Sequence, residues 1–390
     1  MTGLRTQVVR DLAELLALES AWAALYAGSV AATPFQTHGW VTAWAAAYVP
    51  PQRLFVVLVW QDGRLVAAAP LYRRGRGRWA VLAPLGGAIS DHTDVLVEAG
   101  AEAAVWPVLT AALLDEPGWA LLDLPEVRPD ASVRGWSAVW PGSVAVLSAS
   151  SCLELPVLPI RDLLSRMPGR TANTMRRKLR KVDAAGVEVR RVPPADVPGA
   201  VDDLLRLHEE QWAGRNGTAE HFTGRFRAHL TDALRRMVGA GKAAVVEYRV
   251  DGDLVIAQVL LLGRDTLSYY LAGIAPRLRQ RVDTAAVIVR HDIEMALEQG
   301  CARYSMLRGE EDYKTRWRAD VVRQERLLLA RPGPVGTVRA LLADGTARSI
   351  QGVKTWAPWV QSVRSRLKGA PAPVSGRRSL GGTGNQGTPR

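Results

Sequence analysis

The sequence predicts an α/β protein made of two similar domains in tandem, each with a mixed, twisted sheet and flanking helices. Its 390 residues exceed what one ordinary core holds. Two segments, 56–68 (VVLVWQDGRLVAA) and 245–257 (VVEYRVDGDLVIA), also resemble each other along their whole length. Around each segment we predict the same order of elements: helix, hairpin, strand, helix, strand. Two occurrences of this order in one chain are improbable by chance. We therefore expect domains at 1–150 and 151–330.

Each of the two similar segments is predicted to form a β-hairpin. Asp62-Gly63 and Asp251-Gly252 supply the positive backbone angles that a tight turn requires, and β-branched residues flank them. The remaining elements of the first copy are an amphipathic helix (Leu15, Leu16, Leu18, Trp22), a strand at 79–85, a further helix and a strand at 116–125 introduced by a glycine.

The second copy repeats this order. Its first helix carries Leu204, Leu205, Leu207 and Trp212, and its second has apolar residues at helical spacing (Val282, Ala286, Val289, Ile293, Ala296). Gly300 stands where a helix C-cap is expected. Because a helix separates the strands predicted at 266–274 and 302–308, we expect these two strands to be parallel neighbours in one sheet.

The composition favours a soluble, cytoplasmic protein with an anionic partner. The formal net charge is +12, which favours nucleic acid, a membrane surface or a phosphate-bearing ligand. We expect no stable membrane insertion, because no apolar run reaches about eighteen residues. Cys152 and Cys301 have no paired spacing and no neighbouring histidines, so neither a disulfide nor a metal site is predicted.

The C-terminal part is predicted to lie outside both domains. We expect a partly helical extension at 331–368. The segment 369–390 consists largely of Gly, Pro, Ser and Arg without periodicity, which predicts a disordered basic tail.

Charged and aromatic residues follow the strand predicted at 302–308, where a surface loop more often has Gly, Asn, Ser or Pro. This segment, Gly309–Arg318, reads GEEDYKTRWR, and its side chains include groups able to move protons and hold anions. A second polar cluster, Ser90–Asp94, reads SDHTD. The alternative interpretation of both clusters is a solvated turn, with Trp317 as a core anchor.

Together with a third stretch, Thr33–Trp40 (TPFQTHGW), these two polar clusters are the parts of the chain that resemble the Gcn5-related N-acetyltransferase (GNAT) superfamily. Within it, the tandem copy resembles the BioF2-like, or CelD-like, acetyltransferases and the related Fem aminoacyltransferases, over about residues 10–325. The resemblance implies transfer of an acyl group from a coenzyme A thioester or an aminoacyl-tRNA to an amine. The acceptor would be a small molecule or a cell-envelope precursor, bound near the loop after strand 302–308.

The resemblance also implies roles for individual residues. Glu310 is a candidate general base, Tyr313 a candidate proton donor and Lys314 a candidate anion-binding group. Asp91 is a candidate base or acceptor contact if its loop faces the cleft between the domains. The candidate substrate contacts are Asp94, Tyr270 and Trp317.

Two further predictions concern side-chain direction. Tyr269 and Tyr270 are neighbours on a strand, so we expect at most one of them to face the cleft. His208, Glu209 and Glu210 belong to a helix whose leucines face the core, and we expect all three at the surface.

One motif of the superfamily is missing. A glycine-rich turn normally precedes the crossover helix and lets backbone amides meet a pyrophosphate, but this chain has APRLRQRVDT at 275–284. Arg277, Arg279, Arg281 and Thr284 are the candidate contacts to an acyl-CoA, acetyl-CoA first among them.

Two alternatives remain open at this point. The basic segment Arg170–Lys181 (RTANTMRRKLRK) together with the missing glycine turn favours an aminoacyl-tRNA donor. The other alternative is a protein without catalysis that docks on a membrane or a partner through the segment 335–368, which contains Trp356, Trp359, Arg364, Arg366 and Lys368.

Overall fold

The computed structural model describes residues 3–214, 218–343 and 345. Up to residue 341, the described part of the chain forms one compact unit. The tail at 369–390 and the five aromatic and basic residues of the extension (Trp356, Trp359, Arg364, Arg366, Lys368) lie outside the described residues. Within the described part, no helix has the length and apolar character needed to cross a bilayer, and no group of three or more His, Cys, Asp or Glu side chains is placed to hold a metal ion.

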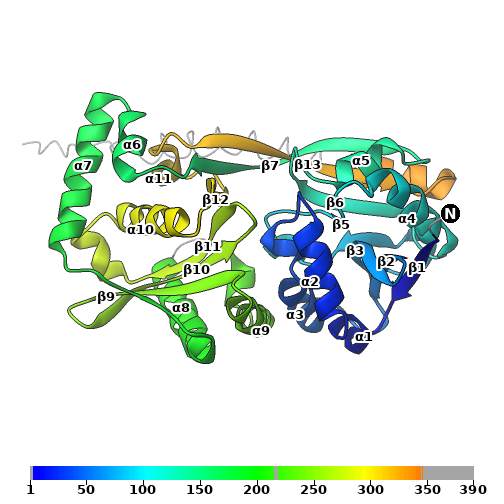
Figure 1. The fold of residues 1–390 in the computed structure, drawn as a ribbon, viewed down its shortest axis with the longest axis horizontal. Helices are drawn as coiled ribbons and strands as arrows, with labels where there is room; N and C mark the ends of the chain where they lie inside the picture. Colours follow the sequence, from blue (N-terminus) through cyan, green and yellow to red (C-terminus); the bar gives the residue numbers. More distant parts are fainter. Residues whose placement is uncertain (1–2, 215–217, 344, 346–390) are drawn as a thin grey trace, which may run out of the picture. The chain divides into compact units, whose positions relative to one another are not determined.

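The chain folds around one large mixed sheet whose strand order is β1-β2-β3-β4-β6-β13-β7-β12-β11-β10-β9-β8, with β5 paired to β3. The order has near-mirror symmetry about its centre, as expected for two copies of one plan (Figure 1). The first-copy strands are β1 (Leu4–Val9), β2 (Leu54–Gln61), β3 (Arg64–Arg74), β4 (Val81–Pro84), β5 (Leu96–Val97) and β6 (Leu121–Val127). The second-copy strands are β8 (Glu188–Arg191), β9 (Ala243–Val250), β10 (Asp253–Leu262), β11 (Thr266–Ile274) and β12 (Arg303–Arg308).

Helices flank both halves of the sheet. In the first copy they are α1 (Leu12–Leu16), α2 (Glu19–Gly28), α3 (His38–Tyr48), α4 (Glu102–Asp115) and α5 (Val133–Ala138). In the second they are α6 (Ile160–Ser165), α7 (Gly169–Ala184), α8 (Val197–Trp212), α9 (Gly224–Gly239), α10 (Thr284–Glu298) and α11 (Asp312–Thr315). The predicted α/β class, with a mixed sheet and flanking helices in both copies, is therefore confirmed.

The two hairpins show the predicted turn chemistry. In β2–β3 and β9–β10, the paired residues leave only Asp62-Gly63 and Asp251-Gly252 in the turns. All four residues have positive φ, between 50° and 81°, the combination that a type I′ turn requires. The crossover prediction also holds, because β11 and β12 are parallel. The strand predicted at 79–85 is shorter, since a 3-10 turn occupies Gly77–Trp79.

The two copies exchange their last strands at the centre of the sheet. β7 (Val144–Pro156), which follows the first copy, pairs with β12 of the second. β13 (Asp320–Ala330), which follows the second copy, pairs with β6 of the first. β7 and β13 also pair with each other, side by side in Figure 1. β7 spans the predicted boundary at 150, and the domain limits stay predictions.

The hydrophobic core is continuous between the copies. One cluster of buried residues runs from α2 and α3 through α9 to the second sheet half, while a second cluster lies between the first sheet half and α4 and α5. α3 packs closely on α9, since a Cβ atom added at Gly39 would lie 3.0 Å from Cβ of Arg236. α9 packs in turn on α8, which lines the cleft described below.

A second close approach sets α8 against β11. A Cβ atom added at Gly273 would lie 2.2 Å from the carbonyl oxygen of Leu204 and 2.6 Å from the amide nitrogen of His208. Only glycine fits there without moving the helix. The contact fixes the distance between α8 and the strand that forms one wall of the cleft.

Candidate active site

A cleft of about 990 Å³ opens where β11 and β12 separate. The two parallel strands pair only from Thr266 to Ser268 on β11 and from Arg303 to Ser305 on β12. Beyond these residues the strands diverge, and their facing edges line the cleft together with α8, the start of α10 and the loop after β12. The first copy contributes Ala88, Ile89 and Asp91. An extended ligand can therefore lie between the two strands, against residues from both copies.

Both Tyr269 and Tyr270 line this cleft, so the prediction that at most one would face it is wrong. The reason is a β-bulge. In the ladder with β10, Leu271 pairs with Val259 and Tyr269 pairs with Leu260, which leaves Tyr270 as an extra residue. An extra residue breaks the alternation of facings. The Tyr270 hydroxyl then donates a hydrogen bond to the Ile89 carbonyl oxygen at 3.0 Å, across to the first copy.

Asp91 and Arg308 join the two copies at one end of the cleft. The Arg308 guanidinium donates to the Asp91 carboxylate, and the Arg308 amide donates to the same carboxylate at 3.3 Å. Other nitrogens of that guanidinium reach the Ala88 carbonyl oxygen at 2.7 Å and Glu126 at 3.5 Å. As expected, the loop containing Asp91 faces the cleft. Its carboxylate is held by a residue that sequence reasoning did not single out.

The loop after β12 is held in place by a buried lysine. Lys314 is 3% exposed, and its Nζ donates to the Arg308 carbonyl oxygen at 2.6 Å and pairs with Glu311 at 2.9 Å. Tyr313, Lys314 and Glu311 line the cleft. Glu310 is exposed and does not line it. Burial raises the pKa of the Tyr313 hydroxyl, which keeps it protonated and able to donate.

Two histidines form a pair in the wall of the cleft. His208 Nδ1 lies 3.0 Å from the Ala272 carbonyl oxygen, and its Nε2 lies 3.3 Å from His221 Nδ1. His208 is 5% exposed, so its predicted surface position is wrong, whereas Glu209 and Glu210 are exposed. Leu204, His208 and Trp212 are spaced by four residues and share one face of α8, a pattern that could have placed His208 inward.

The start of α10 borders the cleft at the end where an acyl-CoA pyrophosphate was expected. Thr284 lines the cleft, but Asp283 caps the helix by accepting a hydrogen bond from the Ala286 amide at 3.0 Å. Asp283 also pairs with Lys178 of α7. An acid at this position competes with an anionic ligand for the helix N-terminus, and Lys178 offsets its charge.

Two of the three arginines predicted to hold phosphates, Arg277 and Arg281, do not line the cleft. Arg277 pairs with Asp253 at 3.1 Å and Arg281 with Asp251 at 2.8 Å, both at the surface near the second hairpin. The side chain of Arg279 lies outside the described residues. Of the predicted donor contacts with described side chains, only Thr284 is therefore in the cleft.

Two predicted substrate contacts lie away from the cleft. Asp94 is buried and accepts hydrogen bonds from the amides of Val95, Ser132 and Val133 at 2.8–2.9 Å, which anchors the start of α5. Trp317 is 2% exposed and belongs to the core cluster, as in the alternative interpretation. The structure thus brings Asp91, Tyr270, Tyr313, Lys314 and Thr284 to one cleft.

The family of the second copy is shown by its sequence. Residues 169–315 match the family model described as "Acetyltransferase (GNAT) domain". They form a GNAT acetyltransferase domain. The GNAT domain supplies most of the residues that line the cleft, and the protein is accordingly an acyltransferase. No curated protein matches the chain.

Solved structures show the same fold over most of the chain. The crystal structure of FemX has 11% sequence identity and a TM-score of 0.58, covering 84% of this chain and 97% of that chain. The C-terminal domain of a putative lysylphosphatidylglycerol synthetase from Agrobacterium fabrum has 12% identity and a TM-score of 0.53, covering 86% and 96%. L-PGS from Bacillus licheniformis has 12% identity and a TM-score of 0.53, covering 85% and 96%. The GNAT domain therefore sits in a larger, Fem-like fold.

Proposed function

We propose that the protein is an N-acyltransferase that moves an acyl group, acetyl in the simplest case, from coenzyme A to an amine bound in the cleft. One observation carries the proposal: the separation of β11 and β12 creates a cleft in which Asp91, His221 and Tyr313 all line the wall. The acyl donor would lie between the diverging strands, with the amine beside the residues contributed by the first copy. The acceptor would be a small molecule or a cell-envelope precursor, met in the cytoplasm.

The His208–His221 pair supplies the base in this proposal. A carbonyl oxygen only accepts, so Nδ1 of His208 must carry the proton that meets Ala272. Nε2 of His208 then accepts from Nδ1–H of His221. This leaves Nε2 of His221 with a lone pair. Burial, followed by the nearby His208, lowers the pKa of His221 to about 4, so the ring is neutral at pH 7 and able to take a proton.

Acyl transfer then follows by direct attack. The amine nitrogen forms a bond to the thioester carbonyl carbon, and the carbon–sulfur bond breaks. His221 Nε2 takes the proton that the amine loses, while the Tyr313 hydroxyl donates to the departing thiolate. The Asp91–Arg308 pair orients the loop beside the acceptor, and Lys314 holds the loop that carries Tyr313. The base role predicted for Glu310 stays a competing hypothesis.

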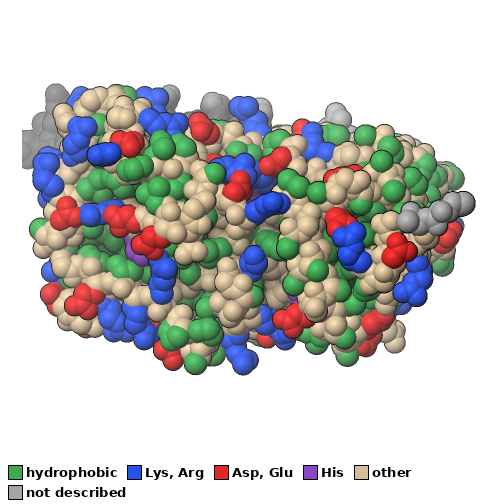
Figure 2. Space-filling model, viewed as in Figure 1, with side chains coloured by type: hydrophobic (Ala, Val, Ile, Leu, Met, Phe, Trp, Pro, Cys, Tyr) green, Lys and Arg blue, Asp and Glu red, His purple; other side chains and the backbone are tan. Residues whose placement is uncertain are grey.

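An aminoacyl-tRNA donor is the second candidate, and a specific observation favours it. α7 carries six cationic residues (Arg170, Arg176, Arg177, Lys178, Arg180, Lys181) and reaches the cleft end of α10 through Lys178 and Asp283. Basic side chains gather along the edge of the molecule where α7 lies (Figures 1 and 2). A polyanionic donor would meet this helix, and it would not need a glycine-rich pyrophosphate turn.

Titration calorimetry and turnover with each donor separate the candidates. We expect saturable binding of acetyl-CoA or a longer acyl-CoA to the full chain, and release of free thiol when an amine acceptor is added. No heat at millimolar acyl-CoA, together with retention of charged tRNA and its loss when Arg176, Arg177 and Arg180 are replaced by Gln, would establish the second candidate instead. Failure of both donors to bind would refute acyl transfer.

A further inference from the structure

A second cavity, of about 620 Å³, lies in the first copy, between the end of α3 and the end of β3. It shares no lining residue with the cleft. Tyr48, which lines this second cavity, donates its hydroxyl hydrogen to Glu220, which lines the cleft, at 2.8 Å. Four of the ten lining residues are arginines (Arg53, Arg73, Arg74, Arg76), and within the described structure none is acidic. The volume is within the range of small-molecule sites.

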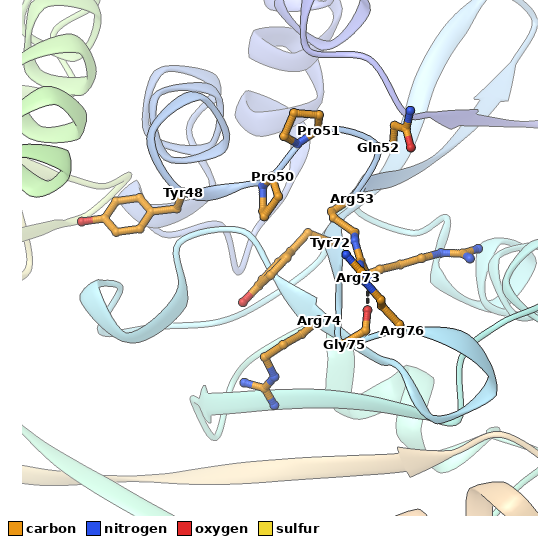
Figure 3. Close-up of a pocket in the computed structure, with 10 residues that line it drawn as sticks. All are labelled: Tyr48, Pro50, Pro51, Gln52, Arg53, Tyr72, Arg73, Arg74, Gly75 and Arg76. Carbon is orange, nitrogen blue, oxygen red and sulfur yellow. Dashed lines mark hydrogen bonds between the residues drawn. The ribbon is translucent and has the colours of Figure 1, made fainter.

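Two of the four guanidinium groups in this cavity, those of Arg53 and Arg76, have no acidic partner among the described residues. Among the described residues, the Arg53 guanidinium donates only to the Gly75 carbonyl oxygen, and the Arg76 side chain has no hydrogen-bond or ion-pair partner. Figure 3 shows both beside Gly75. Surface arginines in this protein commonly pair with an acid, as Arg277 and Arg281 do. Arg53 and Arg76 therefore remain available to a ligand.

The other two arginines share their acids with further arginines. Glu116 pairs with Arg73 at 3.4 Å and with Arg10 at 2.6 Å. Asp123 likewise pairs with Arg74 at 3.0 Å and with Arg326 at 2.7 Å. A single carboxylate between two guanidinium groups leaves positive charge uncompensated.

Arg73 has a buried hydrogen-bond donor that no acceptor in the described structure satisfies. Its Nε is buried and has no hydrogen-bond partner, although a buried donor normally has one. Burial and the nearby Arg10, the largest cationic influence, lower the pKa of Arg73, as expected where positive charges are crowded.

Aromatic rings complete the cavity. Tyr48 stacks on Trp44 with ring centroids 5.1 Å apart, and Tyr72 packs on the same indole at 5.1 Å. Pro50 and Pro51 add apolar surface next to them. Arginines with planar forks match phosphate oxygens, and tyrosine rings offer a surface for a flat or apolar group.

We infer that this arginine-lined cavity is a binding site for a phosphorylated small molecule, with the phosphate group held by Arg53 and Arg76 and its organic part resting against Tyr72 and the prolines. The site does not depend on the acyl-transfer proposal, because it shares no lining residue with the cleft.

Calorimetry of the full chain with inorganic pyrophosphate at fixed ionic strength tests the inference. We expect saturable binding, weakened about tenfold or more in Arg76→Gln and in Arg53→Gln, because each removes a charge-assisted hydrogen bond. Arg78→Gln is the matched control. It removes the same charge from the same loop, but Arg78 lies over Trp79 and does not line the cavity, so binding should stay within about twofold of the parent.

Three results would contradict the inference that this cavity binds a phosphorylated small molecule. The first is the absence of saturable heat at millimolar pyrophosphate. The second is equal behaviour of the Arg76→Gln and Arg78→Gln proteins, which would show general electrostatic attraction. The third is binding to phosphatidic acid vesicles without binding to pyrophosphate, which would show a membrane contact instead. Arg76 is exposed, so its variant should fold and keep the test valid if Arg53→Gln does not fold.

Discussion

Arg308, at the end of β12, donates hydrogen bonds to the carboxylate of Asp91, 217 positions earlier in the chain. Each of the two residues comes from a different copy, and both line the cleft. The pair therefore couples the relative position of the copies to the geometry of the site. Its two side chains are only 29% and 13% exposed, so water screens the interaction less than it would at an open surface.

Breaking this pair should reduce both stability and activity. For Asp91→Asn and for Arg308→Gln, we expect the free energy of unfolding to fall by about 2 kcal/mol and turnover to fall roughly hundredfold, since a misplaced site loses orientation. Denaturant unfolding and steady-state kinetics measure the two effects. The double variant should lose clearly less unfolding free energy than the two single variants lose together. Strictly additive losses would show that Asp91 and Arg308 do not stabilise each other.

Replacing His221 tests the base. We expect His221→Asn to lower kcat by about a hundredfold or more, the usual contribution of general-base catalysis, with little change in folding because His221 is partly exposed. Glu310→Gln is the matched comparison, and it should keep kcat within about twofold, since Glu310 does not line the cleft. The reverse pattern would assign the base to Glu310.

The buried His229 should make the protein less stable in acid. Burial lowers the pKa of His229 to about 3, against about 6.5 in the unfolded chain. Between these values the unfolded state binds more protons, so stability falls as the pH falls from about 6.5 toward 3, by up to about 1.4 kcal/mol per pH unit. Denaturant unfolding of the parent and of His229→Leu, from pH 5 to 7.5, measures the difference in slope. Equal slopes would mean that His229 titrates normally in the folded protein.

Gly273 should tolerate no side chain. We expect Gly273→Ala to lower the free energy of unfolding by about 3 kcal/mol, because the new Cβ overlaps the backbone of α8. Gly199→Ala is the control, because Gly199 lies in α8 and a Cβ atom added there would have no neighbour within 4 Å. This substitution should leave the free energy of unfolding unchanged or raise it by up to about 1 kcal/mol. Similar losses in both variants would contradict the close contact of α8 with β11.

Local chemistry made most of the fold predictable. The Asp-Gly turns and the helical spacing of Val282 to Ala296 depend on neighbouring residues only, so the sequence contains their signal. The partners of β7 and β13 are distant in sequence, and an apolar run does not specify which sheet edge it joins.

The site was less predictable for the same reason. One inserted residue, Tyr270, changes which side chains face the cleft, and no local pattern reveals a bulge. The salt bridges that draw Arg277 and Arg281 to the second hairpin likewise depend on the tertiary fold. The loop of Asp91 was placed correctly because a tandem arrangement leaves such loops between the copies.

The exchanged strands β7 and β13 mean that neither copy is complete by itself. If the chain were cut between β7 and α6, β6 and β12 would each lack a partner strand that belongs to the other fragment. Two such fragments should be poorly folded apart and should reassemble when mixed, as interlocked pieces rather than as docked modules. An ancestor with a single copy would have needed a second molecule to donate that strand, so a symmetric dimer is the natural forerunner of this chain.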